Sequence, residues 1–520
     1  MEQTPGKIPI KRITAIDLGT NSFHAIIVDI FSDGSFYIID RLKEMVLLSE
    51  KGFDNKLSPQ AIERGLNALK RIKTLSDHQN SSKILANATS AIREAENGGE
   101  FIQKVIDEIG IKINAIPGRV EAELIGLAVR HGIEMPDKPS LIMDIGGGSV
   151  EFLLGDKNVF YHVSSKKLGV ARMTASLVDN DPITDEEIEK LIHHYKENLV
   201  DVAQAFAMNR ASLLIGSSGT MQNIALMISA RKKMSPSLSI NELEFSSIDF
   251  FEFYDDVIKM NSKERSDLTG LDEKRIDIIV PGLVLVRYVL KTFGIEKVKI
   301  SSQALREGII LRYIKKEMSD LQLKNGSYSP RLRSVMELVN KYDWHEAHSS
   351  HVAQLSLTLF DEFRDQLQLS DDDRDLLHFA ALMHDIGYFI SHKKHHKHAL
   401  YIIRNSALMG FKEYEIELMA NVARYHRRST PKMRHSYFKA LSKEQRGRVK
   451  KLSGILRVAD GLDRSHYQNV RSLDVVKQNS KVKIIIQTEA DPQLEIWGAM
   501  RKRTLLEDVL GADVEVIYQK

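Results

Sequence analysis

The 520-residue sequence contains no cysteine, and this absence alone excludes several classes of protein. Disulfide scaffolds, thiolate zinc sites, iron–sulfur clusters and cysteine nucleophiles all need thiols, so any metal must be bound by carboxylates or histidines. Proline (12 residues) and glycine (30) are too few for a collagen-like chain, and 43% hydrophobic residues are enough for folded domains. At roughly 100 to 200 residues per domain, we expect three or four globular domains.

The sequence also lacks a long uninterrupted apolar segment. Its most hydrophobic stretch, residues 276–290, is interrupted by Asp277, Pro281 and Arg287, which makes it too polar for a membrane span. The first twelve residues have no apolar region of the kind found in secretion signals. We therefore expect a cytoplasmic protein without a membrane partner.

A large net charge of one sign is missing too, because 73 Lys and Arg residues face 70 Asp and Glu residues. The balance is not uniform, since residues 393–451 contain 16 basic and 4 acidic residues. Such a block is typical either of a surface that attracts a polyanion or of a solvated helix face. Composition does not separate these two interpretations.

What the sequence does contain is an internal repeat between residues 16–29 and 143–156. At an offset of 127 residues, Asp17 matches Asp144, Gly19 matches Gly146 and Ser22 matches Ser149. Each copy has the pattern of a strand, a tight turn of small residues and a second strand. The backbone N–H groups of such turns can surround an anion. Two homologous halves are therefore expected.

The wider pattern predicts α/β halves followed by a helical region. Apolar residues recur at helical spacing from Ile62 to Ile72, between segments with the pattern of strands. From Pro330 to about Ser465 the pattern is helical and rich in histidine, whereas apolar alternation returns in the tail. The expected domains are two α/β domains at residues 1–125 and 126–316, an all-α domain at 317–470 and a small α+β module at 471–520.

Two facing Asp-x-Gly phosphate turns are the arrangement of the sugar kinase, chaperone ATPase and actin superfamily. Six blocks in order, DLGTNSFH, ATSAIRE, GRVEAELIGL, DIGGGSVE, IGSSGT and ALREG, resemble the signature blocks of the exopolyphosphatase and guanosine pentaphosphate phosphohydrolase family. The resemblance implies two duplicated actin-like (ribonuclease H-like) domains, an all-α HD-type domain and a small C-terminal α+β module. It also implies a homodimer with a role in the stringent response. A nucleic acid partner is not expected.

The activity that this resemblance implies is hydrolysis of the terminal phosphate of inorganic polyphosphate, guanosine pentaphosphate or both. The reaction needs groups that hold the substrate's charge, an aligned water and a base near that water. Backbone N–H groups and hydroxyls of the small-residue turns are expected to bind phosphate, namely Asn21, Ser22, Gly146, Gly147, Gly148, Ser149, Ser218, Gly219 and Thr220. The resemblance adds Arg93 as a bidentate phosphate clamp, against the alternative of a surface ion pair with Glu96.

Four carboxylates are the remaining candidates in the α/β region. By resemblance Glu121 is the catalytic base, although periodicity alone makes it an ordinary carboxylate near a helix N-terminus. Asp144 and Glu151 are seven residues apart, and a strand–turn–strand between them can return both to one cleft, where oxygen ligands suit Mg²⁺ or another divalent cation. The resemblance makes them the metal pair. Asp17 either reaches the ion through water or caps its turn.

The helical region contains His351, the doublet His384-Asp385 and Asp460. This is the ligand order of the HD phosphohydrolase superfamily, so the resemblance implies a divalent metal there. A second ion would have His395, His398 and His426 available. The alternative is a vestigial helical scaffold whose histidines pair locally.

Two other functions fit parts of the pattern. One is an ATP-dependent kinase or ATPase of the same fold, which would need an adenosine pocket and a second substrate. The other is a non-enzymatic sensor of an alarmone or polyphosphate, in which the cleft only binds. The sequence does not separate polyphosphate from guanosine pentaphosphate, because both present a terminal phosphoanhydride.

Overall fold

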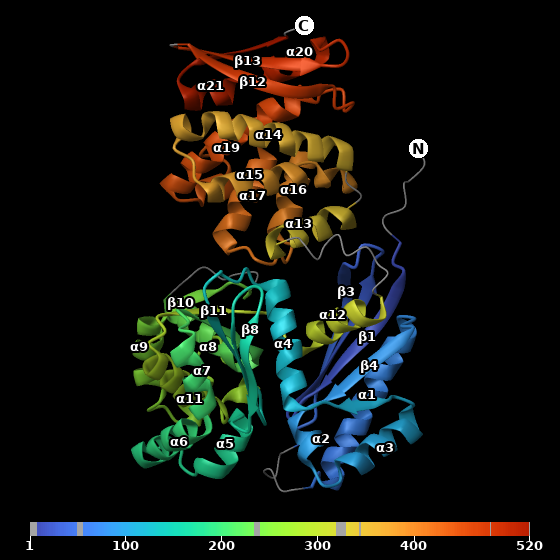
Figure 1. Cartoon of the computed structure of the whole chain (residues 1–520), viewed down its shortest axis with the longest axis vertical. Helices are drawn as coiled ribbons and strands as arrows, with labels where there is room; N and C mark the ends of the chain where they lie inside the picture. Colours follow the sequence, from blue (N-terminus) through green and yellow to red (C-terminus); the bar gives the residue numbers. More distant parts are fainter. Residues whose placement is uncertain are drawn as a thin grey trace. The chain divides into compact units, whose positions relative to one another are not determined.

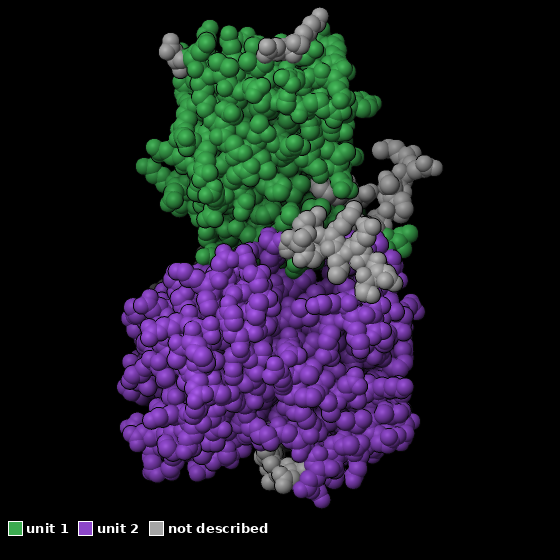
Figure 2. All heavy atoms as spheres, viewed as in Figure 1, with its two compact units in different colours: residues 1–8, 331–520 green, residues 9–330 purple. Residues whose placement is uncertain are grey.

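In the computed structural model of this chain, the described residues are 8–48, 56–232, 240–318, 329–342, 345–478 and 480–518. They form two compact units, shown in Figure 2. We call residues 9–330 the N-terminal unit and residues 331–520 the C-terminal unit. Each has hydrophobic clusters of its own. Within the described part of the chain, no helix is both long and apolar enough to cross a membrane.

The first sheet of the N-terminal unit has the strand order β3–β2–β1–β4–β5, of which Figure 1 labels β3, β1 and β4. Its strands are β1 (Lys11–Leu18), β2 (Ser22–Ile30), β3 (Phe36–Met45), β4 (Lys83–Ala88) and β5 (Ile113–Ala115). One face is covered by α1 (Pro59–His78) and α3 (Gly98–Ile109), and the short α2 (Ser90–Glu94) follows β4. The apolar spacing around Ile62 correctly predicts α1, whose Ser58 accepts the N-cap hydrogen bond from Ala61 N.

The second sheet has the order β10–β11–β9–β6–β7–β8. Its strands are β6 (Ser140–Ile145), β7 (Val150–Gly155), β8 (Phe160–Lys166), β9 (Leu213–Ser217), β10 (Glu244–Ser246) and β11 (Lys297–Ile300). Its helices are α5 (Val170–Leu177), α6 (Asp185–Asn198), α7 (Val200–Met208), α8 (Ser218–Arg231), α9 (Ser247–Val257), α10 (Ser262–Ser266) and α11 (Ile279–Phe293). Every residue of β6 and β7 is buried, as expected for central strands covered on both faces.

The two sheets share a strand arrangement. In each, the first two strands form an antiparallel hairpin, and the first strand also pairs in parallel with the fourth. Asp17 pairs with His24 across the first hairpin, and Asp144 pairs with Glu151 across the second. The two aspartates predicted to be equivalent therefore occupy the same register position. The prediction of α/β structure is confirmed, and both sheets are mixed.

Two helices pack between the sheets of this unit. α4 (Gly118–Gly132) and α12 (Leu305–Glu317) bury apolar residues together with side chains from both sheets, including Ile26, Ile142 and Ile215. α4 is one continuous helix, and the expected domain boundary at residues 125 and 126 lies inside it. The helix therefore packs against both sheets along one continuous length.

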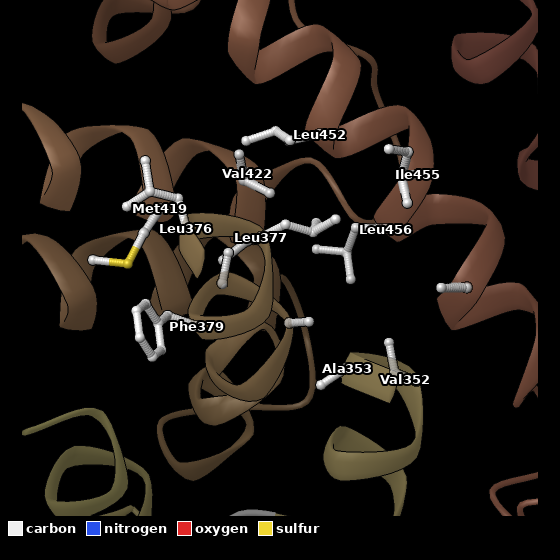
Figure 3. Close-up of a cluster of buried hydrophobic side chains, with 14 of the residues drawn as sticks. Val352, Ala353, Leu376, Leu377, Phe379, Met419, Val422, Leu452, Ile455 and Leu456 are labelled. Atoms are coloured by element: carbon white, nitrogen blue, oxygen red, sulfur yellow. The ribbon is translucent and has the colours of Figure 1, made fainter. Parts of the chain in front are cut away.

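The C-terminal unit begins with helices, as predicted. They are α13 (Pro330–Lys341), α14 (Glu346–Leu367), α15 (Asp371–Met383), α16 (His395–Arg404), α17 (Glu413–Arg424), α18 (Ser436–Lys439) and α19 (Lys443–Leu462), with the 3₁₀ turn η3 (Ile386–Phe389) after α15. Figure 3 shows part of the core, where Leu377, Val422 and Leu456 come from three different helices. The helical character of this region is confirmed.

The tail adds the sheet order β12–β13–β14 and two helices. These elements are β12 (Val470–Gln478), β13 (Lys481–Thr488), α20 (Gln493–Lys502), α21 (Thr504–Leu510) and β14 (Asp513–Tyr518). Ile484 and Val516 belong to the same buried cluster as the helices. The tail and the helices are therefore joined by one hydrophobic core.

Candidate functional site

A cavity of about 290 Å³ lies in the N-terminal unit, between the turn that follows β1 and the turn that follows β6. The two turns have the same geometry, because Gly19 N donates to Ser22 O at 3.2 Å and Gly146 N donates to Ser149 O at 3.0 Å. Repeated local sequence thus forms the two walls of one cavity.

The glycines of the second turn allow the two walls to approach each other. A Cβ atom at Gly148 would lie 2.6 Å from Ser90 Oγ and 2.9 Å from Thr20 Oγ1. A Cβ at Gly147 would lie 3.2 Å from Asn21 Nδ2. No real Cβ tolerates the first of these approaches, so a side chain at Gly148 would force the walls apart.

All of the predicted phosphate-binding positions except Arg93 line this cavity, namely Asn21, Ser22, Gly146, Gly147, Gly148, Ser149, Ser218, Gly219 and Thr220. The hydroxyls of Ser218 and Thr220 form hydrogen bonds to the backbone of β6. Ser218 Oγ accepts a hydrogen bond from Ile145 N, and Thr220 Oγ1 donates one to Ile145 O. Their side chains hold the end of β6, and the N-terminal backbone of α8 faces the cavity. Such a helix end is a favourable place for an anion.

Glu121 lies in the first turn of α4 and lines the same cavity. A Cβ at Gly118 would lie 2.7 Å from Ser165 Oγ, so glycine lets the start of α4 lie against β8. Burial raises the pKa of Glu121 to about 7, with the hydrogen bond and charge of Arg93 acting in the opposite direction. A carboxylate with a pKa near neutrality is suited to proton transfer.

Arg93 is placed differently from the predicted phosphate clamp. Its Nη1 donates to Glu121 Oε2 and to Ile116 O, both at 2.9 Å. The alternative pair with Glu96 is also not formed among the described contacts, since the ion pairs of Arg93 are with Glu121 and Glu94. The arginine therefore orients Glu121 in this structure.

Three further carboxylates line the cavity, of which Asp144 and Glu151 are buried and Asp17 is partly buried. Burial raises the pKa of Asp17 to about 7 and that of Asp144 to about 6, although Ser217 partly opposes the second shift by a hydrogen bond. Burial and the charges of Glu121 and Asp144 raise the pKa of Glu151 well above its usual range. Asp17 Oδ1 is buried and makes no hydrogen bond in the described structure. Concentrated, desolvated carboxylates of this kind are a ligand set for a hard cation.

Three cationic side chains of the cavity were not predicted, namely Lys43, Arg275 and Arg306. Arg275 lies directly over Gly219, where a Cβ would approach Nη2 to 2.0 Å. Arg306 Nη1 lies 3.1 Å from His24 Nδ1, and its charge lowers the pKa of both Asp17 and Asp144 against the effect of burial. Arg306 is part of the ALREG block, so a signal existed for it. Lys43 and Arg275 lie in segments without a motif.

A second cluster lies in the C-terminal unit. Two groups of ligand atoms have the spacing of a metal site: one is His348, His384 and Asp460, and the other is Asp385, His395 and His426. His384, Asp385 and Asp460 are thus brought together as predicted. His351 is not, because its Nε2 donates to Val470 O at 2.7 Å, and His348, one helical turn earlier, takes its place. His398 belongs to neither group.

The histidines of the cluster are oriented alike. Nδ1 of His384 lies 2.6 Å from Ala381 O, and Nδ1 of His426 lies 2.7 Å from Ala423 O, so each ring donates to a backbone carbonyl. Nδ1 of His348 lies 2.8 Å from Asp463 Oδ2. This leaves Nε2 of each ring directed at the cluster, and Nε2 of His348 and His384 is buried without a hydrogen-bond partner there. Metal-binding histidines are held by outer partners in this way.

The strand orders and the cavity define an α/β protein with a cleft suited to an anion. Comparison with known proteins identifies the family. Residues 26–317 match the Ppx/GppA phosphatase family, and residues 331–501 match Ppx/GppA phosphatase domain III. The chain belongs to the Ppx/GppA phosphatase family and is a hydrolase with the actin-like α/β fold of that family.

Individual relatives agree with this membership. The chain is 26% identical over 439 residues to a guanosine-5'-triphosphate,3'-diphosphate pyrophosphatase of Photobacterium profundum, covering 84% of both chains. An exopolyphosphatase of Cytophaga hutchinsonii is 30% identical, with a TM-score of 0.56, and the match covers 60% of this chain and 99% of that one. A Ppx/GppA family member of Aquifex aeolicus is 25% identical, with a TM-score of 0.52, and the match covers 59% and 99%.

Proposed function

We propose that this chain hydrolyses the terminal phosphoanhydride bond of inorganic polyphosphate, guanosine pentaphosphate or both in the cavity of the N-terminal unit. The observation that carries the proposal is the composition of the cavity. The carboxylates of Glu121, Asp17, Asp144 and Glu151 line it together with the backbone of three small-residue turns, which come from both sheets. The names of the relatives, a pyrophosphatase of a guanosine nucleotide and an exopolyphosphatase, support the two substrates.

In the proposed reaction, Glu121 accepts a proton from water as the water oxygen bonds to the terminal phosphorus. The bond from that phosphorus to the bridging oxygen breaks, and the shortened substrate leaves with the bridging oxygen. The anion-binding turns hold the phosphates, and Arg275, Arg306 and Lys43 offset their charge. Arg93 keeps Glu121 in position through the 2.9 Å hydrogen bond.

Mg²⁺ or another divalent cation fits the carboxylates of this cavity. Asp144 and Glu151 would hold it, because they pair across the β6–β7 hairpin and so point to the same face. The unpartnered Oδ1 of Asp17 is a further oxygen nearby. When bound, the cation offsets charge on the phosphate oxygens of the substrate.

Phosphate release tests this proposal against a kinase or a sensor. The wild type should release phosphate from long polyphosphate or guanosine pentaphosphate in the presence of Mg²⁺, without phosphoryl transfer from ATP to another acceptor. Glu121→Gln should lower turnover by about 10² to 10⁴ while substrate binding persists, since a positioned base contributes about that factor. Near wild-type turnover in this variant would remove Glu121 from the mechanism, and tight binding without turnover in the wild type would establish a sensor.

We also propose that the C-terminal unit is an HD-type domain that holds divalent metal. The six side chains of the two groups offer imidazole and carboxylate ligands, and the orphaned Nε2 atoms of His348 and His384 fit such an ion. The double variant His384→Ala/Asp385→Ala should lose metal that elemental analysis finds in the wild type. If wild-type protein purified in buffer that contains a transition metal is found to hold none, the result would support the vestigial scaffold.

The division into four domains, the duplication of the first two, the homodimer and the cytoplasmic location are further parts of the proposal. The common register of the two hairpins supports the duplication. A role in the stringent response is supported by the named activity of the nucleotide pyrophosphatases among the relatives.

A further inference from the structure

A second cavity, of about 470 Å³, lies in the C-terminal unit. It shares no lining residue with the cavity of the N-terminal unit, which we call the phosphatase cleft. Asp385, His395, His426 and Asp460 from the metal-type groups form part of the wall of the second cavity. The rest is provided by η3 and the segment after it, by α19 and α20, and by the segments after α17 and α19. Its size is that of a site for a small ligand, for which about 300 to 1,000 Å³ is usual.

Positive charge dominates the lining of this cavity. The cationic residues are Arg427, Arg428, Arg457, Arg464, Arg501 and Lys502, whereas Asp385 and Asp460 are its only carboxylates among the described residues. The guanidinium of Arg457 is already engaged with the backbone, because it donates hydrogen bonds to Tyr425 O at 2.9 Å and to Arg428 O at 3.2 Å. Arg428, Arg464 and Arg501 form no ion pair within the described ranges. A divalent metal at the two aspartates would increase the positive excess, so the cavity favours a ligand with several negative charges.

An exposed aromatic ring stands beside these arginines. Trp497 of α20 lines the cavity and is 50% exposed. The guanidinium of Arg501, one turn later, lies 5.1 Å from the centre of its ring. Arginine and tryptophan side by side are a stacking surface for a nucleobase. A chain of phosphates alone has no flat ring that could stack on the indole.

Two glycines place this ring next to the metal-type ligands. A Cβ at Gly461 would lie 2.6 Å from Ala499 Cα, and a Cβ at Gly498 would lie 2.4 Å from Gly461 O. α19 and α20 therefore touch at their backbones. Because Asp460 precedes Gly461 and Trp497 precedes Gly498, this crossing brings the carboxylate and the indole to one cavity. The amine of Lys502 in turn contacts the carboxylate of Asp460.

The backbone around the cavity has a further unusual feature. Arg428 has φ = 62° and His466 has φ = 61°, and both side chains line the cavity. Left-handed backbone is unfavourable for residues other than glycine, and it concentrates at sites where a side chain must be aimed. Neither residue lies in a regular helix or strand.

We infer that this cavity is a second ligand site, which binds a nucleotide with two or more phosphates. The base stacks on Trp497, and the phosphates lie against Arg464, Arg501 and Lys502 beside the metal-type ligands. The inference takes from the proposed function only the divalent metal in the C-terminal unit. It is independent of hydrolysis in the N-terminal cleft.

The indole itself provides the test. The sequence has two tryptophans, Trp344 and Trp497, so full-length Trp344→Phe protein reports on Trp497 alone. Protein loaded with Mn²⁺ is titrated with GDP, guanosine and tripolyphosphate. GDP should quench the fluorescence with saturation, and guanosine should quench it only at far higher concentration, because it lacks the phosphates. Absence of saturable quenching by GDP would overturn the inference.

Calorimetry on variants separates recognition of the base from recognition of phosphate. Trp497→Leu should weaken GDP binding roughly 10-fold and leave tripolyphosphate binding within about twofold, since base stacking contributes about 1–3 kcal/mol per base. Arg464→Gln with Arg501→Gln should weaken both ligands roughly 10-fold or more, as expected when charged hydrogen bonds are lost. Tyr401→Leu, at an exposed ring of α16 outside the cavity, is the matched control and should change neither.

The outcomes distinguish this inference from the proposals above. Equal losses for GDP and tripolyphosphate in Trp497→Leu would show a site for phosphate alone and would overturn the nucleotide. Phosphate release that fails while GDP still quenches Trp497 would contradict only the function of the cleft. Elemental analysis of the same samples reports the metal, and thermal melts of each variant identify any that fail to fold.

Discussion

At the scale of single residues, burial is the main influence on the chemistry of the phosphatase cleft. It raises the pKa of Glu121 to about 7 and of Asp144 to about 6, both carboxylates that would be fully ionised at neutral pH in water. Arg93 limits the first shift through its hydrogen bond. The position of an arginine thus decides at which pH the proposed base is ready to accept a proton.

Arg93→Gln should therefore shift the pH dependence of phosphate release. A base acts in its deprotonated form, so kcat/KM rises as pH increases through the pKa of Glu121 and is lost as pH falls below it. Without the arginine this pKa should rise by about one unit or more, because an ion pair at this distance lowers a carboxyl pKa by about 1–3 units. Activity should fall most near pH 6.5 and recover toward pH 9.

The control for this prediction is Arg93→Lys, which keeps the charge and should restore most of the profile. A KM that rises equally at every pH in Arg93→Gln would contradict an orienting role. That result would return Arg93 to the phosphate clamp implied by the resemblance.

The proposed metal pair predicts a pH-dependent affinity for Mg²⁺. The pKa of Asp144 is raised to about 6 and that of Glu151 well above its usual range, so protons compete with the cation for both carboxylates. Calorimetry should find weaker binding at pH 5.5 than at pH 8, with protons released on binding. Asp144→Ala and Glu151→Ala should each abolish this binding, and an unchanged titration in either would refute the pair.

At the scale of elements, close backbone approaches create the sites. The turn after β6 meets Thr20 and Ser90 only because Gly148 has no side chain, and α4 lies close to β8 at Gly118 and Gly126. In the C-terminal unit, Gly461 and Gly498 have the same role for α19 and α20. Elements that contribute functional groups therefore cross at glycines, where no side chain separates their backbones.

Gly148→Ala should disrupt the phosphatase cleft. Its Cβ would lie 2.6 Å from Ser90 Oγ, so the turn must move and the phosphate-binding N–H groups lose their alignment. We expect phosphate release to fall by about 10-fold or more, since misplacement of a reacting group by about 1 Å can lower a rate about 10²-fold.

Gly99→Ala is the matched control for that substitution, because a Cβ there meets nothing within 4 Å. It lies in α3, where alanine is a better helix former than glycine by up to about 1 kcal/mol. Its phosphate release should be unchanged and its melting temperature equal or higher. Equal activity in the two variants would show that the contact between the turns is not required.

At the scale of the molecule, the two units have separate hydrophobic cores. The cluster around Leu377 contains buried residues from Val335 to Val516, whereas the clusters of the N-terminal unit contain residues from Ile13 to Ile314. Each unit also has its own candidate site. A loss of packing in one core should therefore remain local.

Leu377→Ala tests this separation. Leu377 is fully buried, and truncation of a buried leucine lowers the free energy of unfolding by about 2–5 kcal/mol. Hydrogen exchange should become faster in the C-terminal unit and stay unchanged in β1 and β6. Leu214→Ala, in the N-terminal unit, should make exchange faster in that unit and leave it unchanged in the C-terminal unit. Faster exchange in both units from either variant would show that their stabilities are coupled.

The sequence by itself determined the features that depend on neighbours along the chain. The Asp-x-Gly turns and the hairpin that pairs Asp144 with Glu151 are each defined by a short segment, because turn geometry and strand alternation are local. The small-residue positions could therefore be predicted individually. The proposed role of Glu121 as base came instead from the family resemblance. The family blocks also included Arg306, whose role needed the structure.

Only the tertiary structure decided which distant side chains meet. His348 and His351 lie one turn apart on one face of α14, so periodicity could not tell which of them reaches Asp460 and which reaches the carbonyl of Val470. Lys43 and Arg275 enter the cleft from segments far apart in the sequence. Trp497 meets the metal-type ligands because two helices cross at glycines. Such meetings depend on packing between elements, which no local pattern encodes.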